Sequence, residues 1–202
     1  MEAREIQSCR ACYNRTLTPV LDLGDLAVSC FPLPGETPER APLALVRCDR
    51  CSLVQLTHTV PRELLYGEHY WYHSATNESM KAALADVVQD AMKQVSLKPG
   101  DTVLDIGAND GTLLDCYPQD VTRIGFEPAV NVARLAQERG HTIVQDFFPP
   151  SAGLPTKSKI ITSVAMFYDV DRPGEFVDGI KKALAPDGVW VVQMPDLWQM
   201  VN

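Results

Sequence analysis

Apolar patterns typical of strands and helices alternate along the second half of the chain. Five short segments rich in Val, Ile and Phe predict strands, at residues 102–107, 123–127, 142–148, 159–166 and 189–195. Between them, apolar residues follow a helical period at 112–116, 129–140 and 174–188. Strands that alternate with helices in this way predict an α/β domain built on a parallel sheet.

A longer helix precedes this region and begins after the polar residues Ser74, Thr76 and Asn77. Its apolar positions repeat with the helical period: Met80, Leu84, Val87, Val88, Ala91, Met92 and Val95. Just before it, aromatic residues and histidines crowd into residues 66–73. This cluster either packs between two domains or forms a wall over a ligand pocket, and both interpretations stay open.

The first part of the chain carries two Cys-x-x-Cys pairs. Two such pairs in one small segment predict a tetrahedral four-thiolate Zn²⁺ site, which leaves no open position for water and is therefore structural. Its ligands are Cys9, Cys12, Cys48 and Cys51. Apolar alternation around the second pair predicts short strands, and the Pro-rich residues 32–42 predict a loop.

These patterns divide the chain into a zinc-ribbon-like domain at 1–66, an aromatic segment and connecting helix at 67–98, and an α/β domain at 99–202. A module of about 60 residues buries little surface, and a metal compensates for this. The net charge of −8 disfavours binding to nucleic acid, and the sequence has neither a secretory signal nor a membrane span. We therefore expect a soluble, cytoplasmic protein that acts on a small molecule, and its oligomeric state is unknown.

The segment DIGANDGT at 105–112 follows the first predicted strand, at the sheet edge where such folds bind ligands. Gly107 and Gly111 let the backbone turn tightly beside a ligand. The dinucleotide fingerprint requires glycine where Asn109 stands, and the carboxylate of Asp110 would repel a pyrophosphate. This loop favours S-adenosylmethionine, whose cationic end Asp105 and Asp110 could meet.

Two further strand ends support the same cofactor. Glu127 ends the second strand, 20 residues after Gly107, where a carboxylate can accept both ribose hydroxyls. Asp146 and Phe147 end the third strand and suit the amine and the ring face of adenine.

The stretches VLDIGANDGTLL, GFEP, DFF and ITSVAMFYDVDRPGEFV, with both cysteine pairs and YWYHSATNESM, resemble the S-adenosylmethionine-dependent sugar C-methyltransferases of deoxysugar and antibiotic biosynthesis. The resemblance covers nearly the whole chain. It implies a Rossmann-like class I methyltransferase sheet after a zinc-binding domain, with zinc on the four cysteines and cofactor contacts around the residues named above. It also implies that Tyr70 and Tyr72 approach the active site. The family's acceptors are nucleotide-linked keto-deoxysugars, which are methylated at the carbon beside the ketone.

The chain departs from this family at its end. Five of the seven strands of the family's sheet are present, and the His-Glu-His stretch that carries proton transfer would follow Asn202. We therefore expect a cofactor-binding fragment that binds S-adenosylmethionine but turns over acceptors at or near background. His73 is a candidate substitute base, and its alternative is a structural histidine.

Three other functions stay open: a methyltransferase for another small molecule, an NAD(P)-dependent oxidoreductase, and a noncatalytic zinc-ribbon adaptor.

Overall fold

The computed structural model describes residues 3–28, 34–35, 37–67, 70–150, 154 and 156–196. It forms two compact units. The first unit contains Met1–Trp71 together with Asp171–Gly174, and the second contains Tyr72–Val170 together with Glu175–Asn202. Among the described residues, no helix combines the length and the apolar character needed to cross a membrane.

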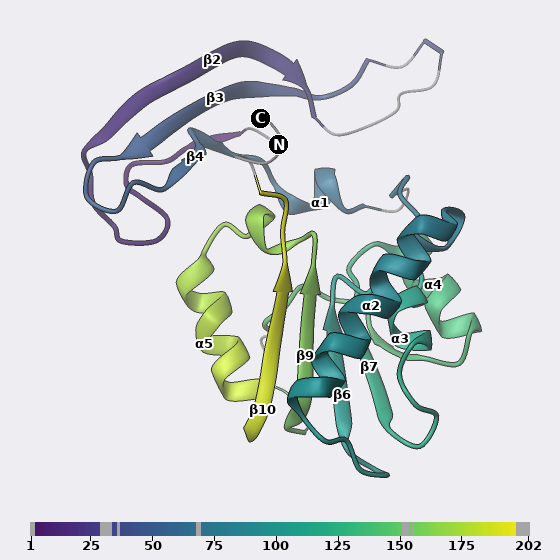
Figure 1. Cartoon of the computed structure of the whole chain (residues 1–202). Helices are drawn as coiled ribbons and strands as arrows, with labels where there is room; N and C mark the ends of the chain where they lie inside the picture. Colours follow the sequence, from purple (N-terminus) through teal and green to yellow (C-terminus); the bar gives the residue numbers. More distant parts are fainter. Residues whose placement is uncertain are drawn as a thin grey trace. The chain divides into compact units, whose positions relative to one another are not determined.

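The first unit is built from antiparallel strands, of which β2 and β3 form a long pair (Figure 1). One sheet has the order β2-β3-β4, and β1 pairs with β5 in a second one. The elements are β1 (Arg4–Glu5), β2 (Leu17–Ala27), β3 (Arg40–Cys48), β4 (Val54–Leu56), β5 (His58–Thr59) and the short helix α1 (Arg62–Leu65). The strands expected around the second cysteine pair are thus present.

The predicted loop at 32–42 is wrong in its last part, because β3 begins at Arg40 and includes Pro42. A proline fits there for two reasons. Its partner Asp25 lies next to a register shift, and β4 pairs only with residues 45–47 of β3. The hairpin partner β2 was not predicted, because Pro19 and two register shifts break its alternation.

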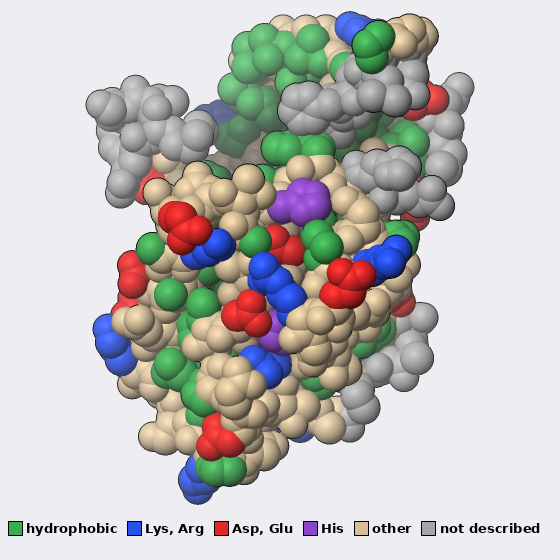
Figure 2. All heavy atoms as spheres, turned by 90° about the vertical axis from the view of Figure 1, so that its right-hand side faces the viewer, with side chains coloured by type: hydrophobic (Ala, Val, Ile, Leu, Met, Phe, Trp, Pro, Cys, Tyr) green, Lys and Arg blue, Asp and Glu red, His purple; other side chains and the backbone are tan. Residues whose placement is uncertain are grey.

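The strand β2 leaves an apolar surface on the first unit. Its side chains Val20, Leu21, Leu23 and Leu26 are between 41% and 55% exposed. Figure 2 shows hydrophobic side chains gathered in the part of the molecule that contains this sheet.

The second unit confirms the predicted α/β fold. Its five strands are all parallel, in the order β10-β9-β6-β7-β8. They are β6 (Thr102–Ile106), β7 (Thr122–Phe126), β8 (Thr142–Val144), β9 (Ser158–Val164) and β10 (Leu184–Gln193). The helices are α2 (Glu78–Gln94), α3 (Thr112–Asp115), α4 (Val130–Glu138) and α5 (Pro173–Ala183), with 3₁₀ turns η1 (Ser74–Thr76) and η2 (Phe167–Asp169).

Alternating residues of the central strands bury opposite faces of this sheet. Val103 of β6 packs in one cluster with Leu84 and Val88 of α2. The next residue, Leu104, packs in a second cluster with Phe176 and Ile180 of α5. The period of two therefore separates the α2 side of the sheet from the α5 side.

Parallel strands bring their carboxyl ends to one edge, so the loops after β6, β7 and β8 meet there. The third strand is shorter than predicted and ends at Val144. Asp146 and Phe147 consequently lie in the loop that follows it.

Candidate functional site

The four predicted metal ligands come together in the first unit. The sulfurs of Cys9, Cys12, Cys48 and Cys51 all lie within 4.8 Å of one another. Two of the S···S distances are 3.6 Å, between Cys9 and Cys51, and 3.5 Å, between Cys12 and Cys48. A tetrahedral Zn²⁺ with Zn–S bonds of about 2.3 Å requires S···S separations near ~3.8 Å. The cluster therefore has the dimensions of a four-thiolate zinc site.

Both cysteine pairs sit in turns of the same kind. The amide of Tyr13 donates to the carbonyl of Cys9 at 3.0 Å, and the amide of Ser52 donates to that of Cys48 at 2.9 Å. The residue after each pair has a positive φ, 60° at Tyr13 and 62° at Ser52. Equal turns of this shape present two sulfurs each to a common point.

The environment of Cys48 favours its thiolate form, which is the form that binds zinc. Burial raises the pKa of this thiol, but hydrogen bonds from the backbone of Cys51 and Arg50 outweigh that effect, with help from the side chains of Cys12 and Asn14. Together they lower the pKa of Cys48 to about 6.

Arg10, inside the first cysteine pair, ties this turn to the following strands. Its guanidinium donates to the carbonyl of Leu56 at 2.7 Å, to the carbonyl of His58 at 3.2 Å and to Oγ1 of Thr59 at 2.9 Å. The turn of the first cysteine pair is therefore held by hydrogen bonds to the following strands, independently of a metal.

The loop that follows β6 in the second unit has the tight geometry expected from its glycines. Gly107 has φ 78°, and a Cβ at this position would lie 3.2 Å from Cγ of Met166. The amides of Gly107 and Ala108 both donate to the carbonyl of Phe126, at 2.9 and 3.0 Å. These bonds fix the start of the loop against the end of β7.

Glu127 lies next to this loop, directly after β7, and its side chain is oriented by backbone amides. Oε2 accepts from the amide of Asn109 and Oε1 from that of Ala129, each at 2.8 Å. The residue is 4% exposed. Burial raises the pKa of Glu127, while the two amide bonds lower it in part. Each carboxylate oxygen keeps a further lone pair for a ligand hydroxyl.

Asp105 lies inside β6, and strand alternation turns its side chain to the α2 side, with Val103. It is 3% exposed, and its Oδ1 accepts from Oγ1 of Thr162 at 2.6 Å. Burial raises the pKa of Asp105 to about 7, and the nearby charge of Glu127 adds to the rise. The predicted contact of Asp105 with a cofactor stays a prediction.

One hydrogen-bond partner of Asp105, Thr162 of β9, was missed from the sequence, and so was the neighbouring Tyr117. Thr162 is fully buried, and Tyr117 is 2% exposed. The charge of Asp105 adds to burial in raising the pKa of Tyr117. A polar Thr directly after the apolar pair Ile160 and Ile161 of β9 was the available signal.

Asn109 and Asp110, predicted to contact the cofactor, direct their side chains to the residues before α2. Oδ1 of Asn109 accepts from the amide of Ser74, and its Nδ2 donates to the carbonyl of Tyr72, both at 3.0 Å. Oδ2 of Asp110 accepts from the amide of Ala75 at 2.8 Å. Any direct role of these side chains toward a cofactor stays a prediction.

The residues predicted to contact adenine lie in the loop after β8. Asp146 is exposed, and its Oδ1 accepts from the amide of Phe147 at 2.7 Å. The partly exposed ring of Phe147 lies in the same loop, and the contact of this pair with adenine stays a prediction.

The aromatic residues predicted to approach the active site belong to different units. Tyr70 is in the first unit, where its ring lies 5.6 Å from that of Tyr66. Tyr72 and His73 are in the second unit. Their part in catalysis stays a prediction.

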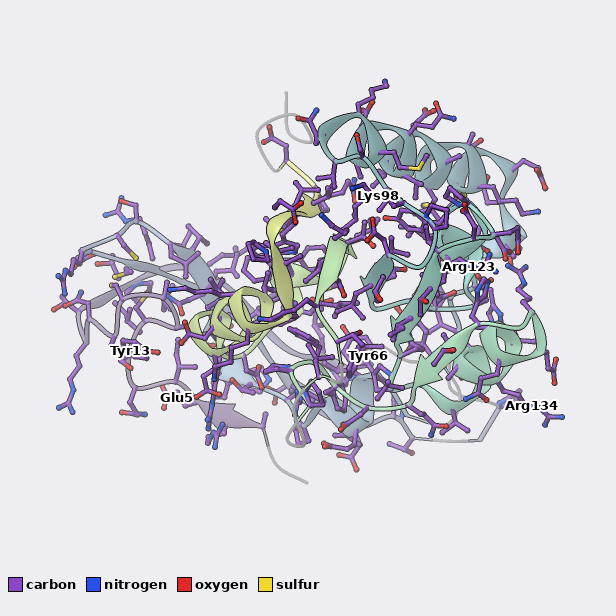
Figure 3. All side chains as sticks on the ribbon, turned by 90° about the horizontal axis from the view of Figure 1, so that it is seen from below. Glu5, Tyr13, Tyr66, Lys98, Arg123 and Arg134 are labelled. Atoms are coloured by element: carbon purple, nitrogen blue, oxygen red, sulfur yellow. The ribbon has the colours of Figure 1, made fainter. Side chains whose placement is uncertain are left out.

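His73 lines an open pocket of about 360 Å³ in the second unit, together with Ala75, Thr76, Asp110, Leu135, Glu138 and Arg139. Arg134 points outward from α4 (Figure 3) and pairs with Glu138 at 3.0 Å. On the face drawn in Figure 2, acidic and basic side chains are interspersed. The described residues on this face therefore form no cluster of basic charge of the kind that binds a polyanion.

Comparisons with known proteins agree with both units. Residues 9–66 match a family described as "Putative zinc binding domain", which confirms the expectation of structural zinc made from the cysteine spacing. Over 98% of its length the chain is 27% identical to the C-methyltransferase NovU of Streptomyces niveus. It covers 50% of that protein, so the chain spans about half the length of this relative.

Solved structures share the fold of the second unit. A S-adenosylmethionine-dependent methyltransferase from Clostridium acetobutylicum matches with a TM-score of 0.52 and 13% identity, over 63% of this chain and 55% of that one. The cyclopropane synthase MmaA2 of Mycobacterium tuberculosis matches with a TM-score of 0.50 and 23% identity, over 71% of this chain and 54% of that one. Finally, residues 76–200, more than half of the chain, match the methyltransferase domain family. The chain belongs to that family of methyltransferases.

Proposed function

We propose that the second unit binds S-adenosylmethionine at the loop after β6, with the ribose hydroxyls on Glu127. The observation that carries this proposal is the orientation of Glu127. Its carboxylate is held at the carboxyl edge of the sheet by the amides of Asn109 and Ala129, and both oxygens keep lone pairs for hydroxyl donors. A pair of adjacent ribose hydroxyls suits a carboxylate fixed in this way.

The rest of the cofactor would follow the same edge. Gly107 leaves the backbone free of a Cβ beside the ligand, and the ring of Phe147 and the carboxylate of Asp146 suit the face and the amine of adenine. When bound, S-adenosylmethionine supplies a methyl group on a positively charged sulfur. The protein's part is to bind, orient and shield it from water.

The loop itself disfavours a dinucleotide. A second glycine would let a pyrophosphate approach the backbone, but here Asn109 occupies that position with a tethered side chain. Asp110 adds a buried carboxylate beside it, which is 2% exposed. Phosphate groups would meet negative charge where they need amide donors.

For the acceptor, we propose a nucleotide-linked keto-deoxysugar that is methylated on carbon. The similarity to a C-methyltransferase over 98% of the chain supports carbon as the methylated atom, and the motif resemblance supports the sugar. A base would remove the proton beside the ketone, and the S-adenosylmethionine held by Glu127 would supply its methyl group to that carbon, with S-adenosylhomocysteine as the other product. Tyr70, Tyr72 and His73 are the proposed acceptor-side residues of this chain.

The first unit would have a structural part in this function. Four thiolates complete the coordination of Zn²⁺ and leave no position for a reacting water. Cysteines that serve as zinc ligands and form no disulfide favour a reducing compartment, and we propose the cytoplasm.

The test is the affinity for S-adenosylhomocysteine, measured by calorimetry on the wild type and on Glu127→Gln. Loss of the charge-assisted hydrogen bonds should weaken binding by about 2–3 kcal/mol, or roughly 30- to 150-fold. Glu78→Gln makes the same chemical change on an exposed side chain of α2 and serves as the matched control. An affinity that is equal in wild type and Glu127→Gln would remove Glu127 from the site.

A further inference from the structure

The loop after β6 is fastened to residues 72–76 by three hydrogen bonds across 35 to 37 positions of sequence. Asn109 supplies two of them, accepting from the amide of Ser74 and donating to the carbonyl of Tyr72. Asp110 supplies the third by accepting from the amide of Ala75. In each contact a loop side chain binds the backbone of the segment, so the contacts fix the path of the segment whatever its side chains are.

The same two residues also hold the loop. The amide of Asn109 donates to Oε2 of Glu127 at 2.8 Å, and its backbone has φ 51°, in the left-handed region that Asn tolerates better than most residues. Oδ1 of Asp110 accepts from Oγ1 of Thr112 at 2.6 Å and from its amide at 3.2 Å. Both side chains are nearly buried, at 8% and 2% exposed.

We infer that Asn109 and Asp110 are positioning residues that couple the order of residues 72–76 to the affinity for the cofactor. The inference rests on the proposed function, because Glu127 is the proposed ribose ligand. Asn109 contacts Glu127 through its backbone and the segment through its side chain, so one residue links the two places. If the cofactor fixes Glu127, it also restrains Asn109 and thereby the segment. By linkage, a freed segment lowers the affinity for the cofactor by the same factor.

The order of residues 72–76 matters because this segment contains two of the proposed acceptor-side residues. Tyr72 and His73 are the acceptor-side candidates of the second unit, and His73 lines the same pocket as Asp110. Residues in a segment without such contacts would sample many conformations, which would cost free energy each time a ligand ordered them. The three hydrogen bonds preorganise the segment in the ligand-free protein.

Three substitutions separate positioning from simple stability. Asn109→Gly keeps the left-handed backbone accessible while it removes both side-chain bonds. Asn109→Asp keeps an acceptor for the amide of Ser74 but loses the donor to Tyr72, so it should restore part of the effect. Asp110→Asn places an NH₂ group opposite either the amide of Ala75 or Thr112, so one of these two contacts loses its acceptor. Asp120→Asn makes the same change at an exposed position and is the control.

The first measurement is amide hydrogen exchange on the full, zinc-loaded chain without ligand. In the wild type the amides of Ser74 and Ala75 should be protected. Asn109→Gly should speed exchange at Ser74 by roughly tenfold, since two net hydrogen bonds are lost. The exchange rate at Ser74 in Asn109→Asp should lie between those of the wild type and Asn109→Gly. Asp110→Asn should instead speed exchange at Ala75. Equal exchange at Ser74 in wild type and Asn109→Gly would overturn the fastening.

The second measurement is binding of S-adenosylhomocysteine to the same proteins. The ligand should slow exchange at Ser74 and Ala75 in the wild type, and Asn109→Gly should weaken its affinity by roughly tenfold. If the wild type binds S-adenosylhomocysteine and Asn109→Gly binds it with the same affinity, the coupling between the segment and the cofactor is wrong, while the proposed function stands. A wild type that binds no S-adenosylhomocysteine would overturn the proposed function and the coupling together, while the exchange data would still decide whether the fastening exists.

Discussion

Asp105 should make the stability of the second unit fall as the pH rises. Burial raises the pKa of this carboxyl from its ordinary 3.8 to about 7, although the bond from Thr162 lowers it in part. An acid with a raised pKa binds its proton more tightly in the folded state. Its contribution to stability is therefore fully present below pH ~4 and is lost as the pH rises through about 7.

The magnitude follows from the size of the shift. A change of about three pKa units corresponds to about 4 kcal/mol between the two limits of pH. Asp105→Asn has the same shape, is neutral throughout, and keeps an oxygen that accepts from Thr162. The variant should therefore be more stable than the wild type at pH 8, by up to about 4 kcal/mol, and the difference should shrink toward pH 4.

Hydrogen exchange at the amides of β6 and β9 measures the free energy of unfolding of the second unit alone. Excess zinc keeps the first unit folded during the measurement. Asp120→Asn is the matched control on an exposed acid. Glu127, whose pKa is also raised, remains in both proteins. Because its charge acts on Asp105, the wild-type profile minus that of the variant reports the titration of Asp105 together with its coupling to Glu127. Parallel pH profiles for wild type and Asp105→Asn, or a variant that is less stable at pH 8, would refute the reasoning.

Three further outcomes are expected. The wild type should carry one zinc ion per chain, and Cys48→Ser should lower both the zinc content and the stability of the first unit. Elemental analysis and thermal melting measure these two effects, and an equal zinc content in both proteins would contradict the four-thiolate site. Arg10→Ala should cost about 1–3 kcal/mol in the first unit and speed zinc release to a chelator, while Arg15→Ala should do neither. Gly125→Ala would place a Cβ 2.7 Å from that of Ala108, so it should destabilise the second unit by about 1–3 kcal/mol in urea unfolding, and a neutral result would contradict the close packing.

Local sequence signals predicted the parts of the structure that depend on local geometry. The Cys-x-x-Cys spacing defines a turn on its own, and two such turns gave the thiolate cluster without knowledge of the strands between them. The five parallel strands followed from runs of β-branched residues that alternate with helical periods. In contrast, β2 was missed because its apolar residues face solvent, and exposed bulged strands carry no regular alternation.

The site was harder to predict, because its contacts depend on the fold. The contact of Asp105 with the cofactor stays a prediction, but its parity with Val103 places its side chain on the α2 side of the sheet. That parity was readable from the sequence. The contacts of Asn109 and Asp110 with Ser74 and Ala75 were not, since they join residues 35 apart through the backbone of one partner.

The central claim is that the loop after β6 and Glu127 form a site for S-adenosylmethionine. Calorimetric titration of the wild-type chain with S-adenosylhomocysteine and, separately, with NAD tests it most directly. We expect saturable binding of one S-adenosylhomocysteine per chain and no binding of NAD. Saturable binding of NAD without any of S-adenosylhomocysteine would contradict it.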